Sequence, residues 1–129
     1  MMIADSDVLI DFLRGKGDGA ERVRLELATG RLATTVLSVY ELLGGVRTSR
    51  EEQRVATLLD ALTVLPLDEA AAREAASIRR SLERQGQKLA TADSLIAAIC
   101  VVNRGVLLTR NRSHFERIPK LTLGTLSER

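Results

Sequence analysis

Short apolar segments that alternate with helical segments constrain the fold of this chain more than any other feature of its sequence. The apolar segments cover residues 2–4, 32–35, 63–67, 106–109 and 121–123. A helical spacing of apolar residues starts at Val8, Leu9, Phe12 and Leu13. Further helices are predicted over residues 20–28, 38–46, 50–62, 68–85 and 92–103, with a helical turn at 113–115. Strands that alternate with helices indicate a parallel sheet covered on both faces, in which functional residues gather at the carboxyl edge.

The length and composition fit one globular domain that spans residues 1–129. The chain is 45% hydrophobic and 28% charged, which allows a core at this size without disulfides. The single cysteine, Cys100, lies in an apolar segment, and we interpret it as a core residue in a reducing compartment. No stretch is long and apolar enough to span a bilayer, and residues 1–10 lack the basic region of a signal peptide. We therefore expect a cytoplasmic protein without a membrane partner.

The charge balance permits nucleic-acid binding without requiring it. The formal net charge is +2, and ten arginines, Arg14 and Arg110 among them, could follow phosphates, although most such charges are ordinary solvated side chains. The chain has two Phe, one Tyr and no Trp, which argues against a surface that binds nucleic acid by base stacking. The glycine-rich turn at residues 15–19 lacks the Gly-Lys-Ser/Thr order of a phosphate-binding loop.

Three acidic residues are the candidates for chemistry, and each also has a purely structural interpretation. Asp5 follows the first strand and could cap the next helix. Glu41 could be a solvated helix residue, although Gly44 and Gly45 on the same face suggest a close neighbour or a substrate. Asp93 could interact with the N-terminus of its helix, for which Thr91 is the predicted cap.

Taken together, the three carboxylates point to a metal site. A strand end and two helices can bring them to the carboxyl edge of the sheet, where their mutual repulsion would be relieved by a cation. Ligands that offer only oxygen select Mg²⁺ or Mn²⁺ over zinc, and the chain has only one His and one Cys. The natural reaction of such a site is metal-assisted phosphodiester hydrolysis.

Four segments carry a family resemblance that extends over nearly the whole chain. They are Ala-Asp-Ser-Asp-Val-Leu-Ile-Asp at 4–11, Ser-Val-Tyr-Glu-Leu-Leu-Gly-Gly at 38–45, Thr-Ala-Asp-Ser-Leu-Ile-Ala-Ala at 91–98 and Leu-Thr-Arg-Asn-Arg-Ser-His-Phe-Glu-Arg-Ile at 108–118. Each segment alone is a weak signal, but their order and spacing resemble the PIN-domain ribonucleases, and most closely the VapC toxins of type II toxin–antitoxin systems.

The resemblance implies a fold, an activity and partners. It implies a three-layer α/β/α sandwich with a central, mostly parallel sheet of about five strands. It also implies a Mg²⁺ site formed by Asp5, Glu41 and Asp93, in which Mn²⁺ can substitute, and cleavage of RNA. The expected partners are the RNA substrate, a cognate VapB-like antitoxin that blocks the site, and a second copy of the chain in a homodimer.

The fourth segment departs from the family pattern. Many members have a fourth acid where this chain has Asn111, and His114 stands where others carry a second Asp. Asn111 can still offer one neutral oxygen. His114 is either a general base or, in the interpretation that we favour, a hydrogen-bonded loop anchor. Asp7 is a further candidate for the site, and we expect Asp11 at the surface.

Two other function classes compete with the enzyme. A phosphoacceptor receiver domain would need a Lys after a late strand, but Arg110 and Asn111 follow the strand at 106–109, so this class is set aside. A PIN-like module that binds RNA without cleaving it remains the alternative, and a metal-titrated cleavage assay distinguishes the two.

Overall fold

A computed structural model describes residues 1–126 and contains a five-stranded sheet in which every pair of neighbours is parallel. The strands are β1 (Met2–Ala4), β2 (Leu32–Thr35), β3 (Thr63–Leu65), β4 (Val106–Leu108) and β5 (Thr122–Leu123). Their spatial order is β3-β2-β1-β4-β5. In the centre, Ile3 is in register with Ala33 on one side and Leu107 on the other. The predicted parallel sheet is thus confirmed, with all five strands at the predicted positions.

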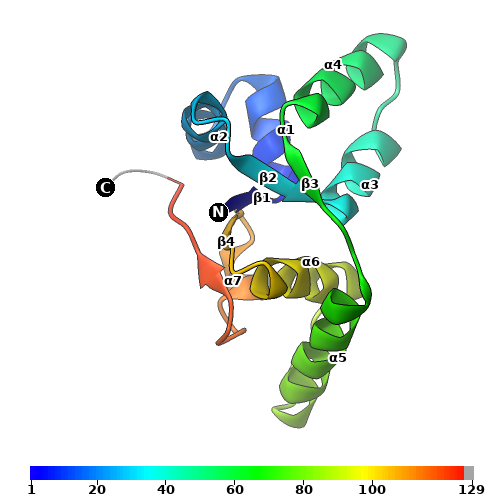
Figure 1. Ribbon diagram of the computed structural model, residues 1–129, viewed down its shortest axis with the longest axis vertical. Helices are drawn as coiled ribbons and strands as arrows, with labels where there is room; N and C mark the ends of the chain where they lie inside the picture. The colour runs from blue at the N-terminus through cyan, green and yellow to red at the C-terminus, as the bar shows by residue number, and fades with distance from the viewer. Residues whose placement is uncertain (127–129) are drawn as a thin grey trace.

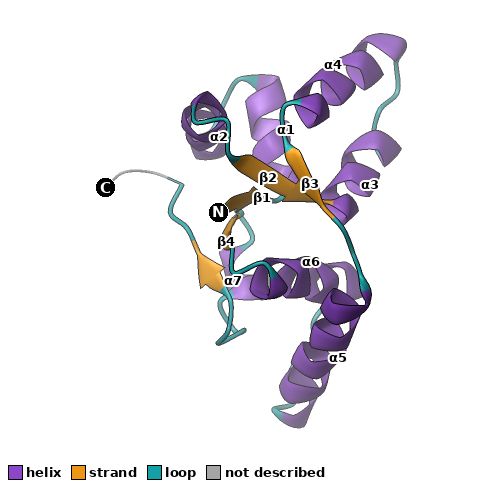
Figure 2. Cartoon of the chain, in the orientation of Figure 1, coloured by secondary structure: helices purple, strands orange, loops and turns teal. Residues whose placement is uncertain are grey.

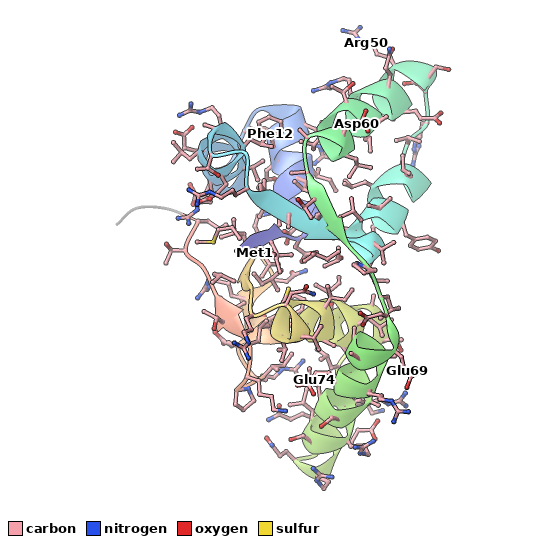
Figure 3. All side chains as sticks on the ribbon, in the orientation of Figure 1. Met1, Phe12, Arg50, Asp60, Glu69 and Glu74 are labelled. Atoms are coloured by element: carbon pink, nitrogen blue, oxygen red, sulfur yellow. The ribbon has the colours of Figure 1, made fainter. Side chains whose placement is uncertain are left out.

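Helices cover both faces of this sheet (Figure 1). Those on one face are α1 (Ser6–Arg14), α2 (Asp18–Ala28), α3 (Val36–Gly44) and α4 (Ser49–Asp60). Those on the other are α5 (Glu69–Arg84), α6 (Thr91–Val102) and the short α7 (Arg112–Phe115). Figure 2 shows the strands between these two layers, and in Figure 3 Arg50 and Asp60 mark the two ends of α4. The arrangement is the predicted α/β/α sandwich.

The alternation of side chains along each strand divides the core into two clusters. Ile3 and Leu107 pack with α5 and α6, whereas the next residues, Ala4 and Leu108, pack with α1 to α4, because successive residues of a strand point to opposite faces. Cys100 is fully buried in the first cluster, and burial raises the pKa of its thiol to about 12. This confirms its interpretation as a core residue. None of the helices in residues 1–126 combines the length and the apolarity required to cross a membrane.

Several local predictions are wrong. Ala90, not Thr91, occupies the cap position of α6, and no side chain caps that helix. Gly44 and Gly45 end α3 and have open space or only their own helix within reach of an added Cβ, so they mark a helix terminus rather than a close neighbour. Helix α3 also begins earlier than predicted, at Val36, because Thr35 caps it by accepting from the backbone N–H of Ser38.

Asp11 is buried rather than at the surface. The turn between α1 and α2 passes over its carboxylate, and this close approach depends on glycine. A Cβ added to Gly19 would lie 2.8 Å from Asp11 Oδ2, and one added to Gly17 would lie 3.0 Å away. The apolar neighbour Phe12 gave no indication of this, because the burial comes from the glycine turn.

Candidate metal centre

Asp5 lies at the junction between β1 and α1. Its backbone N–H donates to the carbonyl of Leu108 over 2.9 Å, which extends the pairing of β1 with β4 by one residue. Its carboxylate caps α1 by accepting from the backbone N–H of Ser6 over 2.8 Å. The side chain is therefore fixed at the carboxyl edge of the sheet, and Asp5 as a whole is only 5% exposed. The capping interpretation of Asp5 is confirmed, and it is compatible with a place in a metal site.

Thr109, directly after β4, connects Asp5 with Asp7. Its hydroxyl lies 2.8 Å from Asp5 Oδ2 and 3.3 Å from Asp7 Oδ2. One hydroxyl proton can serve only one of these oxygens at a time. Asp7 Oδ2 also accepts from the backbone N–H of Arg110 over 3.0 Å, whereas Asp7 Oδ1 is buried without a hydrogen-bond partner.

Glu41 joins the same group from α3. The hydroxyl of Ser6 donates to Glu41 Oε1 over 3.2 Å, and Glu41 itself is exposed. The structure thus brings two of the three predicted acids together with Asp7. We call Asp5, Ser6, Asp7, Glu41 and Thr109 the Asp5 cluster.

The electrostatics of the Asp5 cluster disfavour negative charge. Burial, followed by the charge of Asp7, raises the pKa of Asp5 to about 6, although hydrogen bonds from Thr109 and Ser6 oppose this shift. The charge of Glu41 adds to the rise. Burial also raises the pKa of Asp7, against the hydrogen bond from the Arg110 backbone. A cation would stabilise both carboxylates in their ionised form.

Asp93 lies apart from these contacts, in the first turn of α6. Its Oδ2 is 3.3 Å from Nδ1 of His114 on α7. Within residues 1–126 no hydrogen bond or ion pair joins Asp93 to Asp5, Asp7 or Glu41, and no three His, Cys, Asp or Glu side chains form a ready-made metal-binding group. Because α6 runs back to the start of β4, its first turn does lie on the side of the sheet where the strands end.

Residues 2–121 match the PIN domain family. The chain is 37% identical over 121 residues to "Ribonuclease VapC10" of Mycobacterium tuberculosis, a match that covers 94% of this chain and 90% of that protein. The chain belongs to the PIN-domain family of VapC ribonucleases. This PIN domain is also 27% identical to the "tRNA(fMet)-specific endonuclease VapC" of Shigella flexneri, with 88% and 89% of the two chains covered.

Solved structures of toxin–antitoxin complexes share the fold of this PIN domain. VapBC-1 from nontypeable Haemophilus influenzae superimposes with a TM-score of 0.83 at 23% identity, over 98% of both chains. The DNA-bound VapBC of Salmonella typhimurium gives a TM-score of 0.80 at 25% identity, again over 98% of both chains. These similarities agree with the parallel sheet and the two helical layers described above.

The residues of this PIN domain fit a hard cation. The acids of the Asp5 cluster offer only oxygen ligands, which suits Mg²⁺ or Mn²⁺. The buried Asp7 Oδ1 has no hydrogen-bond partner, and a buried polar atom without a partner is costly unless something else binds it. The raised pKa of Asp5 gives the same indication.

Sequence reasoning missed Thr109 and Ser6, which hold the acids in place, and it left the role of Asn111 open. A polar residue directly after a buried strand, as Thr109 is, was the available signal. Asn111 is exposed and precedes α7 without a capping hydrogen bond from its side chain, while its backbone N–H donates to Thr109 Oγ1 over 3.1 Å. His114 is hydrogen-bonded as a loop anchor would be, but its partner is the candidate site residue Asp93.

Proposed function

We propose that this chain is a magnesium-dependent endoribonuclease and acts as the toxin of a type II toxin–antitoxin system in the cytoplasm. The observation that carries the proposal is the Asp5 cluster: carboxylates at the carboxyl edge of a PIN-domain sheet, with Asp5 buried and one buried carboxylate oxygen of Asp7 left without a hydrogen-bond partner. The relatives named ribonuclease and endonuclease support nuclease activity.

In this proposal Asp5, Glu41 and Asp93 hold Mg²⁺, with Asp7 and Asn111 as additional ligands, and Mn²⁺ can replace it. The ion would activate a water molecule and stabilise charge on the phosphate. The chain's own residues prepare this site. Ser6 and Thr109 orient the carboxylate of Asp5, and Ser6 also orients Glu41. His114 restrains the carboxylate of Asp93.

A cleavage assay tests the proposal against the RNA-binding module that does not cleave. The purified chain is incubated with mixed RNA over a range of Mg²⁺ or Mn²⁺ concentrations, with EDTA as the control. If the proposal is correct, the rate of RNA cleavage increases with the metal concentration and cleavage stops in EDTA. RNA binding without cleavage at any metal concentration would favour the alternative.

A VapB-like antitoxin is the proposed inhibitor, and a groove beside Glu41 supports it. The groove has a volume of about 500 Å³ and is lined by residues of α1, α3 and α4. Its apolar lining includes Leu13, Leu42 and Val55, and Glu41 lies in the same wall. An antitoxin segment could place apolar side chains here and direct an arginine at the carboxylates, in the place of Mg²⁺.

Two measurements test the antitoxin role. Expression of the chain with and without its upstream neighbouring gene should give growth arrest that the neighbour relieves. Binding of the purified antitoxin should compete with Mg²⁺ and weaken in the double variant Asp5→Ala, Asp93→Ala. Equally tight binding by the wild type and the double variant would exclude direct recognition of the acids.

A homodimer is the proposed assembly. Val36, Tyr40 and Leu43 lie along one side of α3, at helical spacing, and all three are exposed apolar or aromatic residues. A second copy of the chain would cover them. Light scattering of the wild type and of Tyr40→Asp tests this: a dimer that the substitution dissociates supports the assembly, and a monomeric wild type contradicts it.

A further inference from the structure

A second pocket lies near the Asp5 cluster, about one turn further along α1. It has a volume of about 460 Å³ and is lined by three cationic residues, Arg14, Lys16 and Arg110, together with Asp11 and Asp18. The cations come from the end of α1, from the turn that follows it and from the loop after β4. Segments that are distant in sequence therefore meet at this pocket.

Arg110 links the pocket to the acidic cluster. Its backbone N–H donates to Asp7 Oδ2 over 3.0 Å, and its guanidinium Nε lies 3.3 Å from Asp11 Oδ2. Asp7 and Asp11 are four residues apart on α1 and so occupy neighbouring positions on one helical face. The pocket thus begins about one helical turn from the proposed metal ligands.

The anchor of Arg110 is built into the fold. The side chain of Asp11 is only 10% exposed, and apart from this ion pair its Oδ2 has no hydrogen-bond partner. Gly17 and Gly19 enclose the carboxylate, and a Cβ at either position would press against it. The Arg110 side chain is 53% exposed, so a buried acid holds a guanidinium whose outer part remains open to the pocket.

The residues that line the pocket have a net positive charge. Within residues 1–126 neither Arg14 nor Lys16 forms an ion pair, and both are exposed. Arg110 balances the charge of Asp11. Asp18 can balance only one of Arg14 and Lys16, so the pocket keeps a net positive charge. The surface therefore changes from anionic at the Asp5 cluster to cationic one turn away.

We propose that this pocket binds a phosphate of the RNA strand next to the one that is cleaved, through Arg14, Lys16 and Arg110, with Asp11 as the residue that positions Arg110. The inference rests on the proposed function, because an RNA bound at a metal held by the Asp5 cluster presents its neighbouring phosphates to the adjoining surface. Arginine and lysine recognise phosphate through charge-assisted hydrogen bonds. The pocket would then fix the register of the strand without reading its bases.

The test measures binding and cleavage separately. Affinity for a fluorescent single-stranded RNA is measured in EDTA by anisotropy over a series of KCl concentrations, for the wild type and for Arg14→Ala, Lys16→Ala and Arg110→Ala. Arg80→Ala is the matched control, because Arg80 is an exposed arginine of α5 in the other helical layer. Each pocket variant should bind about threefold to tenfold more weakly at ~0.1 M KCl. Each should also lower the salt slope of the affinity by about 0.7, and the control should do neither.

Each outcome decides the inference. Wild-type affinity and slope in all three pocket variants would overturn it, and so would a loss of equal size in Arg80→Ala, which would indicate general attraction to a basic surface. Arg110→Ala leaves Asp11 buried without its partner and can disturb folding, but Arg14 and Lys16 do not contact Asp11 through an ion pair, so their variants keep the test valid. Cleavage in Mg²⁺ is scored independently. A protein that fails to cleave RNA but shows the expected binding losses would contradict the ribonuclease proposal and leave the phosphate pocket standing.

Discussion

The Asp5 cluster and Asp93 differ in how firmly the fold holds their carboxylates. Asp5 is 5% exposed and is fixed by the backbone of Ser6 and the hydroxyl of Thr109. The side chain of Asp93 is 19% exposed, and its one described polar partner is His114, whose own side chain is 54% exposed. The first region is therefore preorganised around a buried acid, and the second is held by fewer contacts around a partly buried acid.

This difference matters for how the proposed metal site carries negative charge. A carboxylate buried beside other carboxylates is destabilised as an anion, and the raised pKa of Asp5 records that cost. A bound cation should therefore reduce the charge repulsion within the Asp5 cluster. It should also attract Asp93 and Glu41 to a metal position that the cluster has already formed in part.

The largest expected effect is on catalysis, because the proposed metal site uses acids from both regions. Asp5→Asn and Asp93→Asn should each lower Mg²⁺-dependent RNA cleavage by roughly two to three orders of magnitude or more, since each removes a proposed charged ligand of the ion. Initial rates on one RNA at saturating Mg²⁺ measure the effect. Asp60→Asn, a substitution of an exposed acid at the far end of α4, is the control.

Circular dichroism should show that both variants remain folded, with Asp5→Asn at least as stable as the wild type in the absence of metal. Full activity in a folded Asp93→Asn protein would remove the open half from the site.

The fold could be predicted from the sequence because its signals are local and repeated. Ile3 and Ala4, or Leu107 and Leu108, are buried on opposite faces, and this double burial explains why β1 and β4 are apolar throughout. Helix starts were less predictable. Thr35 and Thr48 cap their helices, but Thr91 does not, because a cap depends on one residue's backbone conformation and not on a periodic pattern.

The candidate site was predictable only in part, for a related reason. Strand ends point to Asp5, and α/β topology points to the edge where Asp93 lies. The contacts of Thr109 with Asp5 and of Arg110 with Asp11 join residues about a hundred positions apart. Such contacts depend on the exact placement of side chains, which no pattern within one segment encodes. The burial of Asp11 was missed on the same ground.

Burial of Asp5 should also make the stability of the protein depend on pH. The folded-state pKa of Asp5, about 6, lies above the ordinary value of 3.8. Its contribution to stability is therefore fully present below about pH 3.8 and is lost as the pH rises through about 6. In the metal-free protein, Asp5→Asn should remove a loss on the order of 2–3 kcal/mol, while Asp7, whose pKa is also raised, still contributes a loss of its own.

Urea unfolding from pH 4 to pH 8, with and without Mg²⁺, measures this difference. The gap between Asp5→Asn and the wild type should widen as the pH rises to about 6 and stay constant above that pH, and it should shrink when Mg²⁺ is added. A gap that is constant over the whole pH range would show that Asp5 does not titrate as its burial implies. Asp60→Asn again supplies the exposed control.

The third prediction concerns the hydroxyl that organises the buried half. Thr109→Val removes a hydrogen bond that lowers the pKa of Asp5, so the pKa should rise further and cleavage should require a higher pH. Stability should fall by about 1–2 kcal/mol, the cost of losing a buried hydrogen bond. Thr34→Val is a matched control, because the Thr34 hydroxyl is equally buried and donates to the backbone carbonyl of Ala4 rather than to an acid. The Thr34→Val variant should lose a similar amount of stability without a shift in the pH profile of cleavage. Identical pH profiles for the two variants would contradict the role of Thr109.

The smallest expected effect concerns Asn111, which lies between the two regions along the chain, after Thr109 and before His114. If Asn111 offers a neutral oxygen to the ion or to its water, Asn111→Ala should weaken Mg²⁺-dependent cleavage less than Asp93→Ala does, because a neutral ligand contributes less than an anion. Asn111→Asp adds a charge, and it should lower the Mg²⁺ concentration for half-maximal cleavage by about twofold to fivefold, a modest change because the position is exposed. If Asn111 only shapes the turn before α7, as asparagine often does, the charge change has no effect on the titration. Magnesium titrations of the wild type and both Asn111 variants decide between these roles, since three overlapping curves would exclude Asn111 from the site.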